Sequence, residues 1–236
     1  MDYRKYEELL NRVMKKCPLE SGVQTLVFMY LDELFENCTK YEPVITDRLQ
    51  DSENSRRYHS DGGFSDILVV NKDFDYNVVK DKPDIKLFVE LKLPEEIGLE
   101  DEKKNIYFIE SIDGVLYRTQ FLGQLLTWGE GIITNGKKWE HYVITDDVKA
   151  TIKSKMKEYC NEKIRAKKTE IAETIQAEKC VKDMFNKPVF SCDIATTIRI
   201  NQLSKKTRIP TQLEVNVNEF LRLTDHINGL IQELNA

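Results

Sequence analysis

Two apolar segments decide the fold of this chain: FSDILVVN at residues 64–71 and IKLFVELKL at residues 85–93. Both are short and rich in β-branched residues, so each is expected to be a buried strand. Each segment nevertheless carries charge, with Asp66 in the first and Glu90 and Lys92 in the second. Because a charged group inside an apolar strand is costly to bury without a partner or a metal ion, these three residues are the leading candidates for function.

Around these strands the chain alternates between helical and extended patterns. Asn135-Gly136, between two of the extended patterns, is a strong hairpin signal. Helices on both sides of a mixed sheet make an α/β domain. We expect helices at residues 2–16, 20–36, 112–129, 147–183 and 215–234, and further strands at residues 41–49, 131–134, 138–145 and 189–200.

The composition fits one sizeable domain with a smaller appended unit. The chain has 236 residues, of which 41% are hydrophobic, and we place the core at residues 1–158. Residues 159–236 are expected to form a mostly helical C-terminal extension for dimerisation or substrate grip. Its final amphipathic helix would either pair with its own copy or pack on the core.

The overall charge and hydropathy exclude several classes of protein. A mean hydropathy of -0.48 and the lack of an apolar run of about 20 residues predict no membrane span, and we expect a cytoplasmic protein. The net charge of -5 argues against a protein that coats nucleic acid by charge alone. The five cysteines have no CxxC spacing, which argues against zinc.

The spacing of the charged strand residues indicates a particular chemistry. Residues two apart in a strand point to the same side, so Glu90 and Lys92 share one face and Leu91 takes the other. Carboxylates from neighbouring strands can hold a hard divalent cation such as Mg²⁺. Such a cation activates water and neutralises charge on a phosphate, while a nearby lysine positions or deprotonates the water. These are the minimum parts for phosphodiester hydrolysis.

Asp66 followed by Glu90-Leu91-Lys92 resembles the PD-(D/E)XK motif of restriction-endonuclease-like nucleases. Ser65 stands where that motif begins with proline. The resemblance implies a three-layer core with a mixed central sheet. It also implies that Asp66, Glu90 and the backbone carbonyl of Leu91 bind Mg²⁺, with Mn²⁺ able to substitute, and that Lys92 serves the attacking water.

Members of this family often carry a glutamate on a helix before the first core strand. Glu20 begins such a helix here, on the same stripe as Val23 and Val27. Facing inward, it would hold a water on the metal or a second ion, and Glu33 and Glu36 are weaker alternatives. The competing interpretation is an ordinary acid at a helix N-terminus, favoured by the helix dipole.

A glutamine supplies the next part of the resemblance. Gln124 with Trp128 is similar to the Gln-x-x-x-Tyr motif of helicase-linked nucleases and of type I restriction subunits. Gln124 would contact a catalytic carboxylate or a phosphate. Gln120, one turn earlier, competes for this role, and a hydrogen-bonded core glutamine is the structural alternative.

The segment GIITNGKKWEHYVI at residues 131–144 extends the resemblance. It is similar to the nuclease domain of type I restriction motor subunits, and the likeness covers roughly residues 20–144. No GxxxxGK[ST] motif occurs, so no helicase is expected in this chain. The domain would act alone, as a homodimer, or with a partner subunit.

The sequence therefore predicts a Mg²⁺-dependent nuclease that hydrolyses DNA phosphodiester bonds. Arg56 and Arg57, in a loop before Asp66, and Gln120 are candidates for contacts with nucleic acid, although a solvated loop explains the arginines equally well. A role in restriction, defence or DNA processing comes from the resemblance alone. Two alternatives stay open: a nuclease fold that no longer cuts and serves as a DNA-binding or scaffold module, and an enzyme that cuts RNA.

Overall fold

The computed structural model describes residues 1–46, 52–60, 62–78, 81–92, 109–112, 115–118, 120–152, 154, 188–202 and 208–236. The chain begins with two helices and then enters the sheet. The described helices include α1 (Tyr3–Lys16), α2 (Glu20–Phe35), α3 (Gln120–Trp128) and α7 (Val217–Asn235), with a short 3-10 helix η1 (Ser55–Tyr58). The strands are β1 (Tyr41–Ile45), β2 (Ile67–Asn71), β3 (Ile85–Leu91), β4 (Ile109–Ile112), β5 (Val115–Arg118), β6 (Glu130–Thr134), β7 (Lys138–Val143), β8 (Phe190–Asp193), β9 (Ala195–Gln202) and β10 (Arg208–Val215).

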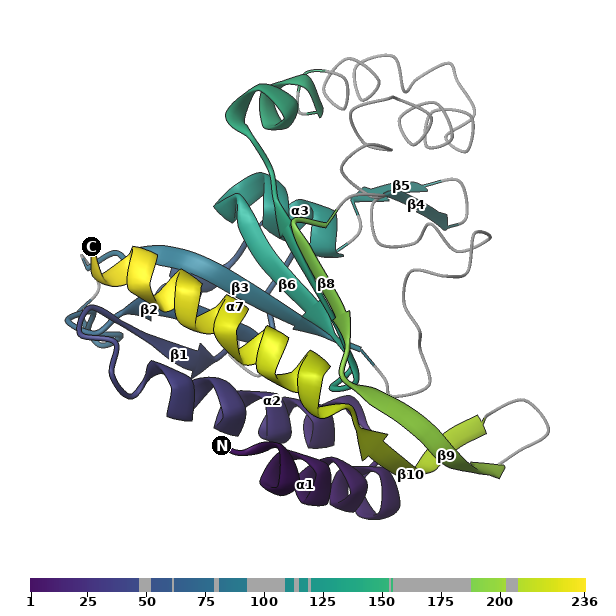
Figure 1. Ribbon diagram of the computed structural model, residues 1–236. Helices are drawn as coiled ribbons and strands as arrows, with labels where there is room; N and C mark the ends of the chain where they lie inside the picture. The colour runs from purple at the N-terminus through teal and green to yellow at the C-terminus, as the bar shows by residue number, and fades with distance from the viewer. Residues whose placement is uncertain are drawn as a thin grey trace.

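Six strands form one mixed sheet in the order β1-β2-β3-β6-β7-β8 (Figure 1). All neighbours are antiparallel except β3 and β6, which pair in parallel and are joined through α3. The α/β class predicted from the sequence is confirmed. Residues 131–134 and 138–143 form the predicted hairpin, and Gly136 in its turn has the positive φ of 82° that favours glycine.

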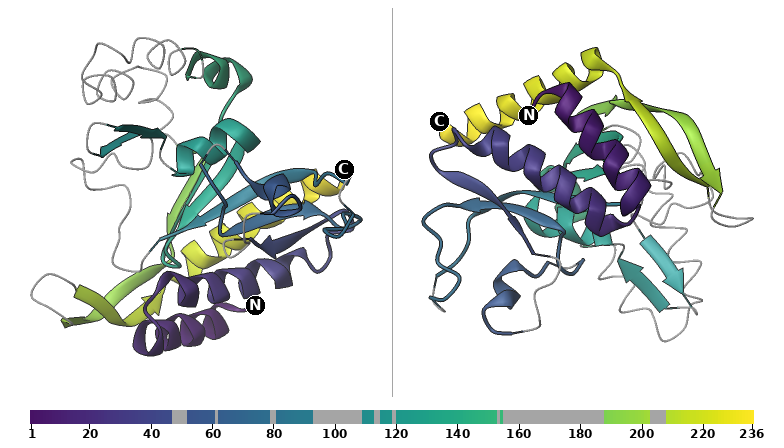
Figure 2. Two further views of the ribbon diagram at one scale, coloured as in Figure 1. Left: turned by 180° about the vertical axis from the view of Figure 1, so that it is seen from behind. Right: turned by 90° about the horizontal axis from the view of Figure 1, so that it is seen from below.

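Alternating side chains divide the sheet between two hydrophobic cores. Ile67, Val69, Val89 and Leu91 pack toward α1, α2 and α7, whereas Leu68, Val70, Phe88 and Ile133 pack toward α3. Figure 2 shows the two sets of helices on opposite faces of the sheet. This alternation follows from the two-residue repeat of a strand, and it sends Glu90 to the α3 face.

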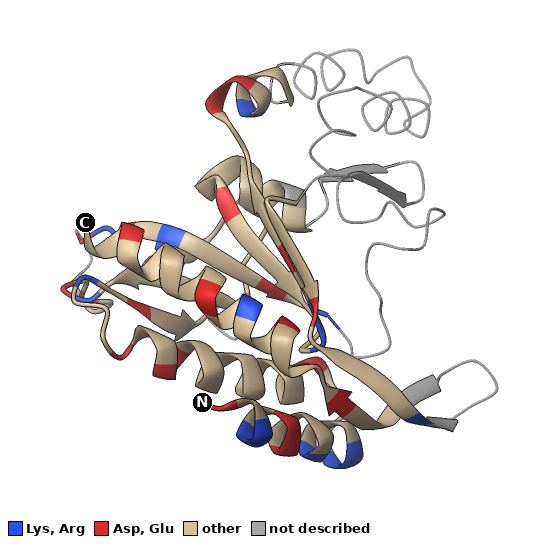
Figure 3. Ribbon diagram, in the orientation of Figure 1, with Lys and Arg blue, Asp and Glu red and all other residues tan. Residues whose placement is uncertain are grey.

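Helix α1 has the expected amphipathic character. It buries Tyr6, Leu10 and Met14, while acidic and basic residues follow its outer side (Figure 3). The side chain of Asp2 caps the helix by accepting from the N–H of Lys5 at 2.8 Å. The hydroxyl of Tyr6 crosses the core and donates to the carbonyl of Gly136 at 2.8 Å, which fixes α1 against the β6–β7 turn.

The predicted helix at residues 112–129 is wrong in its first half. Ile112 ends β4, residues 115–118 form β5, and the helix begins only at Gln120. The physical reason is Asp113-Gly114 between the paired residues Ile112 and Val115. Asp-Gly is among the strongest signals for a two-residue hairpin connection, and it outweighs the helical spacing of the apolar residues.

Two other predicted elements differ from the structure or extend beyond its described part. The strand predicted at residues 41–49 ends at Ile45, and residues 47–50 lie outside the described residues. Residues 146–152 are helical as expected. Most of the helical segment predicted at 147–183 also lies outside the described residues.

The described part of the C-terminal extension does not stand apart from the core. Strand β8 completes the main sheet by pairing with β7, and β9 and β10 form a separate hairpin. Helix α7 buries Phe220, Leu223, Ile227 and Ile231 in the same core as α1 and α2. The extension therefore contains three described strands besides its helix, and α7 packs on the core. Among the described residues, no helix has the length and apolar character to cross a membrane.

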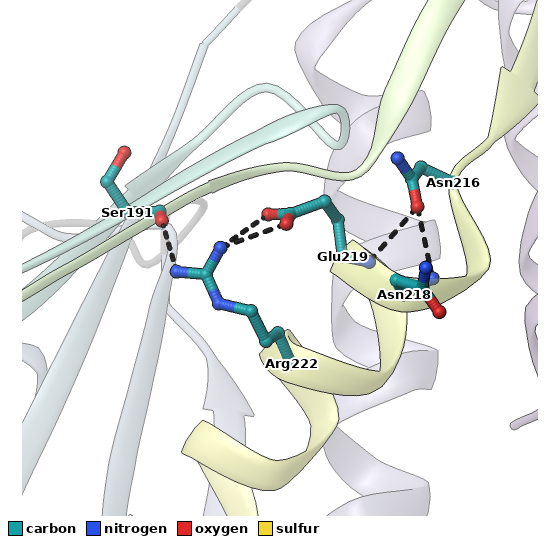
Figure 4. Close-up of polar contacts among 5 residues, drawn as sticks. All are labelled: Ser191, Asn216, Asn218, Glu219 and Arg222. Atoms are coloured by element: carbon teal, nitrogen blue, oxygen red, sulfur yellow. Dashed lines mark hydrogen bonds and ion pairs between the residues drawn. The ribbon is translucent and has the colours of Figure 1, made fainter.

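Polar contacts fix the start of α7 against β8. Asn216 caps the helix by accepting from the N–H groups of Asn218 and Glu219. Arg222 pairs with the Glu219 carboxylate and donates to the carbonyl of Ser191 at 3.1 Å (Figure 4). Farther along, the ring nitrogens of His141 and His226 lie 3.0 Å apart.

The close approach of β3 and β6 predicts that Gly131→Ala destabilises the fold. A Cβ at Gly131 would lie 2.2 Å from the ring of Phe88, so the ring would have to move within a packed core. We expect a loss of about 1–3 kcal/mol in the free energy of unfolding, measured by urea denaturation. Gly229→Ala is the control, because nothing lies within 4 Å of its added Cβ and alanine favours the helix. Equal stability of the two variants would contradict this packing.

Candidate active site

Asp66 lies immediately before β2, and its backbone is held from two sides. Its carbonyl accepts from the N–H of Thr46 at 3.1 Å and from the side chain of Gln24 on α2 at 3.3 Å. Its carboxylate oxygen Oδ2 accepts from the N–H of Leu91 at 2.6 Å. The side chain of Asp66 is therefore aimed at the end of the neighbouring strand β3.

Glu90 lies near the end of β3 and is almost completely buried, with 1% of the residue exposed. Lys92 Nζ lies 2.6 Å from Oε1 of Glu90, and Gln124 Nε2 donates to Oε2 at 3.0 Å. Both carboxylate oxygens therefore have a donor. The prediction that Glu90 and Lys92 share a face while Leu91 takes the other is confirmed by these contacts and by Leu91 in the opposite core.

Lys92 follows the last residue of β3, but its backbone remains fixed to the sheet. Its N–H donates to the carbonyl of Thr134 at the end of β6 at 2.9 Å. The side-chain relative exposure is 15% for Lys92 and 2% for Glu90. The ammonium therefore reaches the more open side of the cluster, while the glutamate lies beneath it.

The electrostatics of the cluster are dominated by burial. Burial, followed by repulsion from Glu90, raises the pKa of Asp66 to about 8. Burial also raises the pKa of Glu90, although Lys92 and Gln124 oppose the shift. For Lys92, burial acts against the charge, but the attraction of Glu90 and Asp66 outweighs it and raises the pKa. The lysine is therefore charged, and the two carboxyl groups favour holding a proton.

Glu20 is brought to this cluster, but not in the inward orientation that the sequence predicted. As the first residue of α2 it is exposed, whereas Gly22 and Val23 in the same turn are buried. Its negative charge nevertheless contributes to raising the pKa of Asp66, Glu90 and Lys92. Glu20 thus lies within electrostatic reach of all three residues.

Gln124 occupies the position predicted for it. Its side chain is fully buried, and its Nε2 contacts both Glu90 and, at 3.3 Å, the carbonyl of Phe64. Its Oε1 has no hydrogen-bond partner among the described residues, and a buried acceptor without a partner is uncommon. The side chain of Gln120, the competing candidate, lies outside the described residues.

Arg57 is engaged within the fold, which favours a structural role over the predicted contact with nucleic acid. Its guanidinium donates to the backbone carbonyls of Asn54, Val78, Asp81 and Tyr76 and lies over the ring of Phe74 at 4.9 Å. These carbonyls satisfy its planar donors, so Arg57 connects η1 to the segment between β2 and β3. Arg56 is exposed and keeps its place as a candidate contact.

The residues present fit a hard divalent cation. Asp66 and Glu90 offer carboxylate oxygens, and the N–H of Leu91 points toward Asp66. In a strand the N–H and C=O of one residue point to the same side, so the Leu91 carbonyl opens toward Asp66 as well. No three His, Cys, Asp or Glu side chains converge on one point among the described residues, but Mg²⁺ is commonly held by one or two carboxylates and water.

Gln24 is a site residue that the sequence analysis missed. It is buried with 6% exposure on α2, one turn after Glu20, and it contacts the backbone of Asp66. The available signal was a polar residue among the apolar residues Val23, Leu26 and Val27. Such a residue requires a partner, but only the packing of α2 on β2 identifies that partner.

No family model, curated protein or solved structure matches this chain. The functional interpretation of the site therefore rests on its own residues and geometry.

Without a divalent cation, we expect the stability of the protein to fall as pH rises from about 4 to 8. Asp66 titrates near 3.9 when unfolded and at about 8 when folded, so the folded state binds this proton more tightly. Its stabilising effect is complete below the unfolded pKa and is lost as pH passes through the folded pKa. Asp66→Asn should flatten this part of the curve of melting temperature in EDTA.

Asp84→Asn is the matched control for this measurement. Burial raises the pKa of Asp84, but hydrogen bonds from Tyr41 and Lys86 outweigh it and lower the pKa. Its effect on stability therefore lies below about pH 4. A parent curve that is flat between pH 4 and 8, or one that Asp66→Asn leaves unchanged, would contradict the raised pKa.

The contacts of Arg57 predict a structural role that can be separated from binding. Arg57→Ala should lower the free energy of unfolding by about 2 kcal/mol or more, because it leaves several carbonyl groups without their charged donor. Arg57→Lys should restore little of this stability, since an ammonium cannot reproduce the planar donor set. Chemical denaturation measures both variants, with Arg56→Ala as the control. If Arg57→Ala instead lost affinity for DNA while keeping the stability of the parent protein, Arg57 would be a binding residue and not a structural one.

Proposed function

We propose that this protein is a Mg²⁺-dependent nuclease that hydrolyses phosphodiester bonds of DNA and is built on a restriction-endonuclease-like core. One observation carries the proposal: the buried cluster in which Asp66, Glu90 and Lys92 converge from β2 and β3. The mixed sheet with helices on both faces supports the proposed core. A role in restriction, defence or DNA processing is part of the same proposal and rests on the sequence resemblance.

In this proposal, Asp66, Glu90 and the carbonyl of Leu91 hold the Mg²⁺ ion, and Mn²⁺ can take its place. When bound, the cation supplies an activated water and neutralises charge on the phosphate. The N–H of Leu91 orients Asp66 at 2.6 Å, and Gln124 orients Glu90 at 3.0 Å. Because both carboxylates are already positioned, little reorganisation is needed for them to act.

The proposed role of Lys92 is to hold positive charge beside the reacting phosphate. Its raised pKa favours an ammonium that orients water and stabilises developing negative charge, rather than a base that accepts a proton. The partial exposure of Lys92 over a buried Glu90 supports contact with a substrate approaching from solvent. Glu20, exposed at the edge of the same cluster, is placed to hold a water at this side.

Cleavage of a DNA duplex with Mg²⁺ present tests the proposal. Asp66→Ala and Lys92→Ala should each lower the rate by about a hundredfold or more, because each removes a group that acts on the reacting charge. Asp84→Ala and Lys86→Ala are matched controls: this pair, at 2.9 Å, lies at the start of the same strand β3. Parent-level cutting by folded Asp66→Ala and Lys92→Ala proteins would refute the mechanism.

Calorimetric titration with Mg²⁺ and Mn²⁺ provides a readout besides cleavage. The parent protein and Lys86→Ala should bind the ion, and Asp66→Ala should not. Binding should tighten as pH rises toward 8, because the ion competes with the proton held by the carboxyl pair. Absence of ion binding by the parent would leave a DNA-binding or scaffold protein with the same fold as the better description.

A further inference from the structure

The hairpin of β9 and β10 forms a sheet of its own and extends beyond the main sheet (Figures 1 and 2). The consecutive residues Thr196, Thr197, Ile198 and Arg199 are all exposed, although neighbouring residues of a strand point to opposite faces. Ile198, an apolar residue, has a relative solvent exposure of 52%. A two-stranded ribbon without a cover gains little from burial, so residues 196–199 form a surface that is unpartnered among the described residues.

The base of this hairpin is firmly attached to α1. Asn11 donates to the carbonyl of Leu213 at 2.9 Å and accepts from its N–H at 2.7 Å. Glu7 accepts from the N–H of Val215 at 2.8 Å. Just beyond these contacts, register shifts between Pro210 and Leu213 interrupt the pairing, and such bulges bend a ribbon. The hairpin is thus a fixed arm that changes direction where it leaves α1.

The arm begins at the same end of the sheet as the candidate active site. Lys92 donates through its N–H to Thr134 at 2.9 Å, and Ile194 donates to Lys137 at 2.8 Å. Thr134 and Lys137 flank the same β6–β7 turn. The site and the base of the arm therefore lie on either side of one hairpin turn.

The arm is basic in a chain whose net charge is -5. Between residues 195 and 215, which span both strands, the sequence has four basic residues, Arg199, Lys205, Lys206 and Arg208, and one acidic residue, Glu214. Lys205 and Lys206 lie outside the described residues, whereas Arg199 is exposed on β9. Helix α1, which anchors the arm, ends in the exposed residues Lys15 and Lys16, and Figure 3 shows this end of α1 beside the arm.

We propose that the β9–β10 arm, together with the end of α1, is a docking surface for the backbone of duplex DNA that directs the duplex toward the Asp66–Glu90–Lys92 cluster. The proposal rests on the proposed nuclease function and names the form of its substrate. Positive side chains neutralise phosphates and provide most of the affinity for DNA that is independent of sequence. They also offset the repulsion that an acidic site exerts on the same substrate.

The shape of the arm favours a DNA duplex over an RNA duplex. The major groove of B-DNA is wide enough to admit a two-stranded β-ribbon, whereas the major groove of A-form RNA is too deep and narrow to enter. An exposed apolar side chain such as Ile198 can contact the methyl group of thymine. RNA has no such methyl group, so both features of the arm fit DNA.

Binding of a fluorescent 20-base-pair DNA duplex in EDTA tests this surface apart from metal-dependent cleavage. The double variant Arg199→Glu/Lys16→Glu, which changes one residue of the arm and one at the end of α1, should bind about tenfold more weakly. The slope of log affinity against log salt should fall in magnitude by about two, for two lost phosphate contacts. Lys40→Glu/Lys72→Glu is the control with the same change of charge. Its exposed residues lie at the opposite end of the sheet, where β1 begins and β2 ends, and it should match the parent.

The outcomes separate the arm from the nuclease proposal. The milder Arg199→Gln/Lys16→Gln protein should also bind more weakly than the parent, and it keeps the test decisive if the reversed charges unfold the arm. The docking surface would be overturned if the affinity for DNA fell equally in the docking-surface variants and in the control. It would also be overturned if neither docking-surface variant lost affinity for DNA. Tighter arm-dependent binding of an RNA duplex would overturn the assignment to DNA. If DNA binding depends on the arm but the parent protein does not cut DNA, the docking surface is supported and the nuclease proposal is refuted. If both docking-surface variants cut DNA at the parent rate and cutting depends on Asp66, the nuclease proposal is supported and the docking surface is refuted.

Discussion

A buried carboxylate near the end of an apolar strand is the constraint around which this end of the molecule is arranged. Glu90 is 1% exposed, and an ionised group in such surroundings is strongly disfavoured unless it is paired and hydrogen-bonded. Lys92 and Gln124 supply one donor to each of its oxygens. The lysine comes from the same face of β3, and the glutamine comes from the helix that joins β3 to β6. The local chain order therefore brings both partners to the acid.

The same arrangement leaves the second carboxylate, Asp66, with less compensation. It accepts a hydrogen bond from the N–H of Leu91 but has no side-chain cation of its own among the described residues, because Lys92 is already paired with Glu90. Two acids and one ammonium therefore leave an excess of negative charge in a buried place, which a proton or a cation can balance. Local arrangements that cost stability are often found at functional sites. The excess negative charge is therefore the strongest physical reason to associate the cluster with a divalent cation.

The sequence was sufficient for the parts of the fold that depend on local periodicity. The two-residue repeat of β3 placed Glu90 and Lys92 together, and the apolar spacing of residues 215–234 predicted the helix that the structure shows as α7. Contacts between distant segments were different. The role of Arg57 depends on carbonyls more than twenty residues away, and no local pattern shows them. The hairpin at Asp113-Gly114 was predictable in principle, but the apolar spacing of the following helix concealed it.

The net charge of a chain describes the distribution of its charges poorly, and this protein illustrates why. Acids that are buried and balanced in the cluster contribute little to the field outside, because they pair with Lys92 or bind a proton. Arg199 on the exposed arm contributes its full charge to the approach path of a ligand. An acidic chain can therefore present a positive surface at one end of its sheet. The negative total excludes a protein that coats nucleic acid uniformly, yet it is compatible with one that holds a duplex at a single edge.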